Sequence, residues 1–213
     1  YSCSDFNLEE FISQVIKAKD FVSKGTSKYL ATLNRIYELI KDNTSYGYDS
    51  TKLGHEAFIN VLSSRVRTPN KLTIATTNYD VLFEEAAENI GFSVVDGFTY
   101  SSKPHFDSDM FEWNLVKDVP NIKTKEFEYK KKVVNLIKLH GSVTWEKDEN
   151  EDKIYRKDRK QVKLPVMVFP NSDKYSQSYA EPYFELFYKF QELINRPNTL
   201  LITTGFSFGD AHI

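Results

Sequence analysis

The chain contains one cysteine, Cys3, among its 213 residues. A single thiol excludes a disulfide within the chain, and it excludes a zinc site built from several thiolates. Such a chain suits a reducing compartment, so we expect a cytoplasmic protein. The opening residues, YSCSDFNLEE, have neither the basic nor the apolar region of a signal peptide.

Long apolar runs and an excess of one charge are also missing. No apolar run approaches the roughly 20 residues that cross a bilayer. The 28 Lys and Arg residues nearly balance the 30 Asp and Glu residues, which leaves a net charge of -2. Overall charge therefore gives no electrostatic reason to bind nucleic acid. We predict direct contact with neither nucleic acid nor membrane.

Glycine is scarce, but aromatic residues are abundant. No two of the eight glycines are separated by a single residue, so the chain lacks a G-x-G phosphate loop. Aromatic residues make up 15% of the chain, with 16 Phe and 13 Tyr. They suit a packed core, a ring-stacking ligand site or an assembly surface, and composition does not choose among these. The length fits one sizeable domain, with or without an inserted lobe.

The first third of the chain has helical periodicity. Apolar residues recur at three- and four-residue spacing in three segments, which are Phe6–Val22, Leu30–Ile40 and His55–Val66. Polar and glycine breakers fill residues 42–54 between the second and third helices. We predict a helical segment over residues 1–68, as a small lobe or as part of one domain.

Strands and helices alternate after Pro69. The predicted strands are Leu72–Ala75, Ser93–Val95, Val133–Leu139 and Thr199–Thr203, with a further apolar segment at Leu164–Phe169, and the predicted helices are Val81–Ile90 and Tyr183–Ile194. Buried strands that alternate with helices predict an α/β fold. We expect a Rossmann-like parallel sheet flanked by helices over residues 69–213. Residues 100–132 lose periodicity and read as an irregular insertion.

Polar clusters follow three of these strands, as TTNYD at Thr76 to Asp80, LHGS at Leu139 to Ser142 and GFSFGD at Gly205 to Asp210. In open parallel sheets, ligands bind outside the carboxyl ends of the strands. We therefore interpret the three clusters as parts of one site.

Asn78 and Asp80 lie between a strand and a helix. They offer amide donors, a carboxylate and free backbone N–H groups, which suit a ribose or a phosphate. The alternative is that one of them only caps the following helix, which is common at such turns.

His140 follows the buried strand and precedes Gly141. An imidazole at the sheet edge can serve as a general base, and a neighbouring glycine lets a ligand approach the backbone. A lone histidine is, however, more often a hydrogen-bonded structural residue.

The third cluster suits nucleotide binding. Its glycines allow backbone contact with phosphate or ribose, and the Ser207 hydroxyl can donate or accept. A structural turn would also use Gly205 and Gly209. Asp210 and His212 have no further ligands at suitable spacing, so we predict no metal site and a structural or supporting role for both.

In this order and spacing, the three motifs resemble the sirtuin-like NAD-consuming domains of bacterial antiphage defence systems. Asp96-Gly97-Phe98, Trp145 and the PNSDKY stretch from Pro170 are also similar to that group. The resemblance covers about Lys71 to Ile213.

The resemblance implies a role for each matching residue. Asn78 corresponds to the residue that holds the nicotinamide ribose and the attacking water, and His140 to the catalytic histidine. Asp80 corresponds to the aspartate near the nicotinamide amide. The other residues that we assign to NAD binding are Thr77, Gly141, Gly205 and Ser207.

Departures from the family pattern narrow the expected reaction. Sirtuin deacylases carry a four-cysteine zinc module, which a chain with Cys3 alone cannot build. We therefore expect no zinc and predict hydrolysis of NAD to nicotinamide and ADP-ribose, with water as nucleophile. The alternatives are transfer of ADP-ribose or an acyl group, and an assembly subunit that binds NAD or ADP-ribose without turnover.

The resemblance also implies parts and partners outside this sequence. The family carries a GAG loop for the pyrophosphate, which we expect upstream of Tyr1. The sequence also stops at Ile213, directly after a polar cluster, so we expect a piece of a longer protein. Related domains act as oligomers under a partner ATPase or a phage-derived activator, and we expect a homo-oligomer here.

Overall fold

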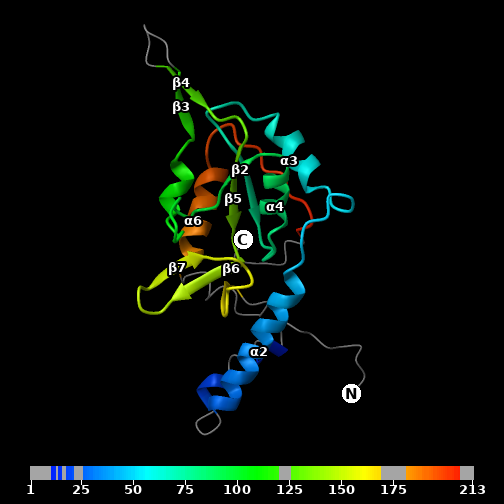
Figure 1. Cartoon of the computed structure of the whole chain (residues 1–213), viewed down its shortest axis with the longest axis vertical. Helices are drawn as coiled ribbons and strands as arrows, with labels where there is room; N and C mark the ends of the chain where they lie inside the picture. The colour runs from blue at the N-terminus through cyan, green and yellow to red at the C-terminus, as the bar shows by residue number, and fades with distance from the viewer. Residues whose placement is uncertain are drawn as a thin grey trace.

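The computed structural model describes residues 11–12, 14–15, 18–21, 26–119, 126–168 and 181–206. Its helices are η2 (Ala18–Phe21), α2 (Thr26–Thr44), α3 (His55–Ser63), α4 (Leu82–Asn89), η3 (Ser108–Glu112) and α6 (Tyr183–Ile194), where η marks a 3-10 helix. Its strands are β1 (Leu72–Thr76), β2 (Ser93–Val95), β3 (Val116–Val119), β4 (Glu126–Tyr129), β5 (Val133–Lys138), β6 (Gly141–Asp148), β7 (Lys153–Arg156) and β8 (Pro165–Met167), arranged as Figure 1 shows.

A parallel sheet forms the centre of the fold, with strand order β1-β5-β2. β5 lies in the middle, and all six of its residues are buried. It pairs with β1 from Leu72↔Val134 to Thr76↔Lys138, and with β2 on its other side. A continuous apolar run is typical of a strand covered on both faces. The predicted α/β fold with a Rossmann-like parallel sheet is confirmed.

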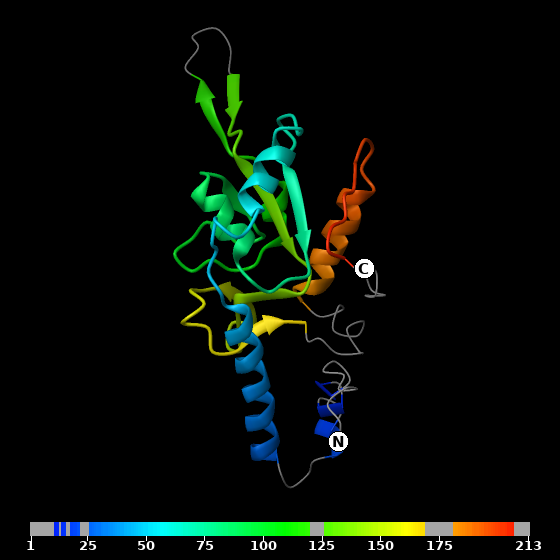
Figure 2. The same cartoon turned by 90° about the vertical axis from the view of Figure 1, so that its right-hand side faces the viewer.

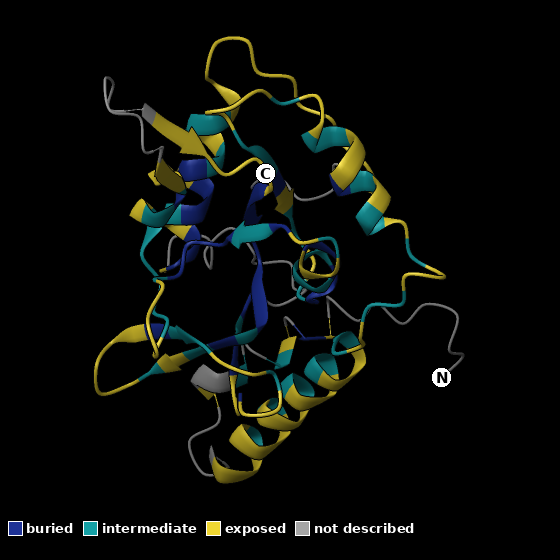
Figure 3. Cartoon of the chain, turned by 45° about the horizontal axis from the view of Figure 1, so that its top comes forward, coloured by how far each residue is buried: buried dark blue, intermediate teal, exposed yellow. Residues whose placement is uncertain are grey.

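Helices cover both faces of this sheet, and the side chains of β5 alternate between them. Val134 and Leu136 pack with Ile59 of α3 and with alanines of α4. Val133 and Ile137 join the larger core on the other face, which contains Leu186 of α6. Figure 1 shows α6 and α4 on opposite sides of the strands, and Figure 3 shows buried residues concentrated in the sheet.

A second, antiparallel sheet follows β5 directly, with strand order β7-β6-β8. The chain turns at His140 and enters β6 at Gly141. Trp145 of β6 is buried against Phe98 at a ring-centroid distance of 5.1 Å, so both sheets share one core. Part of this sheet comes from the mixed-charge stretch between Lys147 and Lys163.

The N-terminal helices agree with the sequence pattern where they are described. α2 and α3 confirm the predicted helices Leu30–Ile40 and His55–Val66. Of the predicted helix Phe6–Val22, residues 11, 12, 14 and 15 are α-helical and η2 follows, while the remainder lies outside the described residues. Figure 2 shows α2 extending away from the sheet.

Two predictions about the second half of the chain need correction. The stretch 100–132, predicted to be irregular, contains η3 and the antiparallel pair β3–β4. The predicted strand Thr199–Thr203 is wrong, because these residues have no strand conformation and pair with none of the strands in the described ranges. Leu200 is 82% exposed, so its apolar side chain does not mark a buried strand here.

None of the helices in the described ranges is both long enough and apolar enough to cross a membrane.

Candidate functional site

The TTNYD and LHGS segments meet at the carboxyl edge of the parallel sheet. Their strands are neighbours, and Thr76 pairs with Lys138. The backbone N–H of Leu139 donates to the carbonyl of Thr76 at 2.9 Å, and the N–H of Val143 donates to the carbonyl of Tyr79 at 3.1 Å. Two backbone hydrogen bonds therefore hold the second motif against the first.

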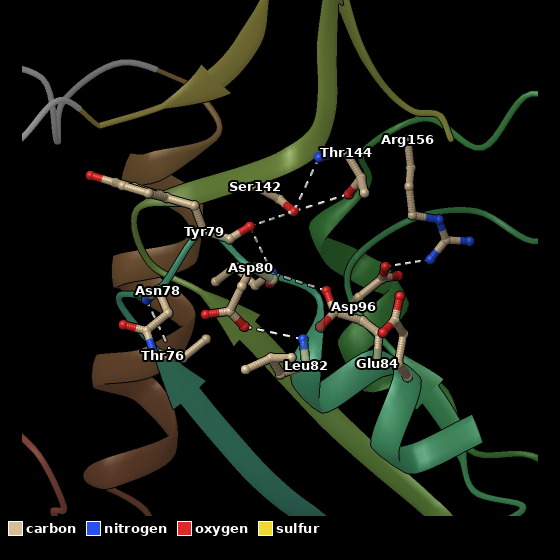
Figure 4. Close-up of polar contacts among 12 residues, drawn as sticks. Thr76, Asn78, Tyr79, Asp80, Leu82, Glu84, Asp96, Ser142, Thr144 and Arg156 are labelled. Atoms are coloured by element: carbon tan, nitrogen blue, oxygen red, sulfur yellow. Dashed lines mark hydrogen bonds and ion pairs between the residues drawn. The ribbon is translucent and has the colours of Figure 1, made fainter. Parts of the chain in front are cut away.

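Asn78 lies at the exposed tip of this turn. Its backbone N–H donates to the Thr76 hydroxyl at 3.1 Å, which fixes the turn. Its side-chain amide makes no hydrogen bond to the rest of the described chain, and Figure 4 shows it at the end of the tip. Thr77 is half-buried beside it. An exposed amide held on a fixed backbone can accept a polar ligand.

Asp80 is buried and makes a structural contact. Its Oδ1 accepts a hydrogen bond from the N–H of Leu82 at 3.1 Å, at the start of α4 (Figure 4). Asp80 therefore makes the contact with the start of the helix that the alternative interpretation predicted. The Tyr46 hydroxyl also bonds the carboxylate, and the pKa of Tyr46 is raised by partial burial and by this negative neighbour.

His140 is buried at 4% exposure, in the turn two residues after the central strand ends. Its carbonyl accepts a hydrogen bond from the N–H of Val168 at 2.8 Å, which ties it to the end of β8. Gly141 follows with a φ of +82°, and a Cβ there would lie 2.1 Å from the carbonyl oxygen of Val166. Packing alone therefore explains why this position is a glycine. Its assignment to NAD binding remains a prediction.

Lys138 is a residue of this edge that the sequence pattern did not reveal. Its side chain is 1% exposed, and its Nζ donates to the carbonyl of Asp80, to the carbonyl of Tyr79 at 3.4 Å and to Oε1 of Glu84 at 3.0 Å. Burial raises the pKa of Glu84, and the Lys138 charge opposes this.

Asp96 and Arg156 form a second polar pair at the end of β2. Asp96 is buried, it accepts from the N–H of Phe98 at 3.3 Å, and the Arg156 guanidinium bonds its other oxygen (Figure 4). Burial raises the pKa of Asp96, and Arg156 opposes the rise. The pair borders an open cleft of about 530 Å³. The cleft is lined by α4, β2 and the stretch after β7, and it includes Val81 and Thr144 beside the TTNYD and LHGS segments.

The third motif, GFSFGD, does not follow a strand of this sheet in the described part of the chain. Gly205 follows the exposed segment 199–204, with a φ of +64° and no atom of a described residue within 4 Å of its Cβ position. Ser207, Asp210 and His212 lie outside the described residues. The described part of the site is therefore built from TTNYD, LHGS and Asp96.

Among the described residues, no group of three or more His, Cys, Asp and Glu side chains is placed to hold a metal ion. A family model described as "SIR2-like domain" matches residues 72–213. No curated protein matches the chain. The family match supports an NAD-related activity, and the matched range contains every residue that we assigned to the site.

Proposed function

Because the chain belongs to the family of SIR2-like domains, we propose that it hydrolyses NAD to nicotinamide and ADP-ribose. The observation that carries this proposal is the pair of backbone hydrogen bonds, Leu139 to Thr76 and Val143 to Tyr79. They hold the segments that contain Asn78 and His140 at one edge of the parallel sheet, which is where such sheets bind ligands.

Cleavage breaks the bond between the nicotinamide nitrogen N1 and the ribose carbon C1′. The electron pair leaves with nicotinamide, and positive charge develops on the ribose. A water oxygen then bonds C1′ and its proton passes to a base, for which His140 is our candidate. The exposed amide of Asn78 would orient the ribose and the water, which lowers the entropic part of the barrier.

The cysteine content favours water over an acyl group as the nucleophile. Deacylation in sirtuins accompanies a four-cysteine zinc module, and Cys3 is the only cysteine here. In this chain the antiparallel sheet β7-β6-β8 follows His140 directly. We therefore propose NAD as the substrate and assign zinc no part in the reaction.

Asn78→Ala and His140→Ala test the proposal. Each should reduce nicotinamide release from NAD to background, and Asn70→Ala, an exposed residue before β1, should leave it unchanged. Thermal melting of each variant checks that folding is retained. Undiminished turnover in both site variants would refute the assignment.

Product analysis separates hydrolysis from the two alternatives. Equal amounts of nicotinamide and free ADP-ribose indicate hydrolysis. Nicotinamide with ADP-ribose attached to protein indicates transfer, and tight NAD binding by calorimetry without released nicotinamide indicates a binding subunit.

We also propose a setting in bacterial antiphage defence, where the reaction would deplete NAD, with the protein acting as a cytoplasmic homo-oligomer under a partner ATPase or a phage-derived activator. Support comes from the motif resemblance. NAD measured in infected cells should fall with the intact gene but not with Asn78→Ala, and sedimentation of the purified protein would give the oligomeric state.

A further inference from the structure

Lys138 is a charged side chain in β5, a strand whose six residues are all buried. It ends β5, and its ammonium group lies between the TTNYD turn and α4. An ammonium group has three donors, and here it meets three acceptors: the carbonyls of Tyr79 and Asp80, and the carboxylate of Glu84. Every donor of this buried group therefore has a partner.

Burial of this charge needs a reason. Moving an ammonium group out of water costs free energy, and apolar residues of similar volume often replace buried ion pairs without loss of stability. If this position served only to pack β5 against α4, an apolar side chain would suffice. What an apolar side chain cannot do is donate to the carbonyls that follow Asn78.

We propose that Lys138 is a positioning residue of the site, which fixes the turn carrying Asn78 and Asp80 through the backbone carbonyls of Tyr79 and Asp80. This inference rests on the proposed NAD chemistry of that turn. Glu84, in the first turn of α4, supplies the counter-charge and links the same ammonium to the helix. Lys138 thus ties the strand end, the turn and the helix start together.

The geometry explains why the contact matters for Asn78. Its side chain is exposed, so its direction depends on the backbone of the turn. The Asp80 carbonyl accepts from Lys138, and no other donor to it occurs in the described part of the chain. A displacement of about 1 Å in a site of this kind costs on the order of 100-fold in rate.

A pair of variants separates positioning from simple charge neutralisation. Lys138→Met keeps an unbranched side chain but leaves the partly buried carboxylate of Glu84, which is 25% exposed, without its counter-charge. The double variant Lys138→Met, Glu84→Gln removes both charges. We expect the single variant to lose both thermal stability and activity, and the double variant to regain most of the melting temperature.

Activity should follow a different course from stability. In the double variant we expect kcat/KM for nicotinamide release to stay on the order of 100-fold below wild type, with most of the loss in kcat. If the double variant recovers both its melting temperature and its kcat/KM, Lys138 only neutralises Glu84 and the proposal is overturned.

Hydrogen exchange tests the positioning without NAD turnover. In the double variant, the backbone amides from Asn78 to Leu82 should exchange at least about tenfold faster than in wild type, while those of β5 should not change. Equal exchange across the turn would overturn the positioning role even in an inactive protein. A wild-type protein that releases no nicotinamide contradicts the proposed function instead, so the two failures are distinguishable.

Discussion

Gly141 lies where the packing of the fold leaves no room for a side chain. A side chain there would need a φ of +82°, and its Cβ would lie 2.1 Å from the Val166 carbonyl oxygen. We predict that Gly141→Ala loses several times the stability lost by Gly205→Ala. Gly205 also has a positive φ, +64°, but no atom of the described residues lies within 4 Å of its Cβ position, so alanine there should cost only about 1–2 kcal/mol. Urea unfolding of both variants measures the difference, and equal losses would contradict the steric argument.

At the residue scale, the sequence predicted where polar side chains follow strands but not how they are held. The neighbouring positions of Asn78 and His140 follow from a general rule, since parallel strands end at one edge. Lys138 could not be recognised, because a lysine is normally exposed and its acceptors come from a turn and a helix far away in sequence. The partner of Asp96, Arg156, was hidden for the same reason.

At the element scale, Glu146 ties β6 to the segment before β8. Burial alone would raise the pKa of Glu146, but hydrogen bonds from Lys157 and from the N–H groups of Lys163 and Leu164 lower it below its ordinary value of 4.5. The carboxylate therefore stabilises the fold above that value, and the contribution is lost as the pH falls through the lower native pKa. We predict a weaker acid dependence of unfolding for Glu146→Gln.

Urea unfolding across the acid range checks this prediction, with Glu149→Gln as the control. Glu149 is exposed, in the turn between β6 and β7, and it makes no hydrogen bond within the described chain. An acid dependence that Glu146→Gln leaves as steep as in wild type and in the control would refute the role of Glu146.

Helix α6 is joined to η3 by an ion-pair network. Lys189 of α6 contacts Glu112 of η3, and Arg196 lies 3.6 Å from the same carboxylate. We predict a coupling free energy of about 0.5–1 kcal/mol between Glu112 and Lys189, modest because Glu112 is half-exposed. A double-mutant cycle with alanine at both positions measures it. Additive losses would show that the two side chains have no coupling free energy.

At the element scale, the sequence predicted those helices and strands whose apolar pattern matches the face that they bury. The runs that became β5, α4 and α6 are apolar on the faces that the core covers, so their periodicity was sufficient. The pair β3–β4 was missed because its strands bury little apolar surface: Val116 is 48% exposed and Phe127 is 59% exposed. For residues 199–203 the error was the reverse, because a strand was predicted where there is none. An apolar run does not specify which strand it will pair with.

At the scale of the whole molecule, Asp96 and Arg156 connect the two sheets, since one follows β2 and the other ends β7. Burial raises the pKa of Asp96 above its ordinary value of 3.8, despite the guanidinium. The native carboxyl thus keeps its proton to a higher pH than the unfolded one. Its contribution to stability is complete below 3.8 and is lost as the pH rises through the native pKa.

This dependence has the opposite sign to that of Glu146, so the stability of the molecule should pass through a maximum as the pH changes. We predict that Asp96→Asn flattens the decline above the maximum and leaves the acid side unchanged, because an amide oxygen still accepts from Phe98 but does not titrate. Unfolding free energies from about pH 3 to pH 8 measure both sides. An upper decline equally steep in Asp96→Asn and wild type would place its origin outside the junction between the two sheets.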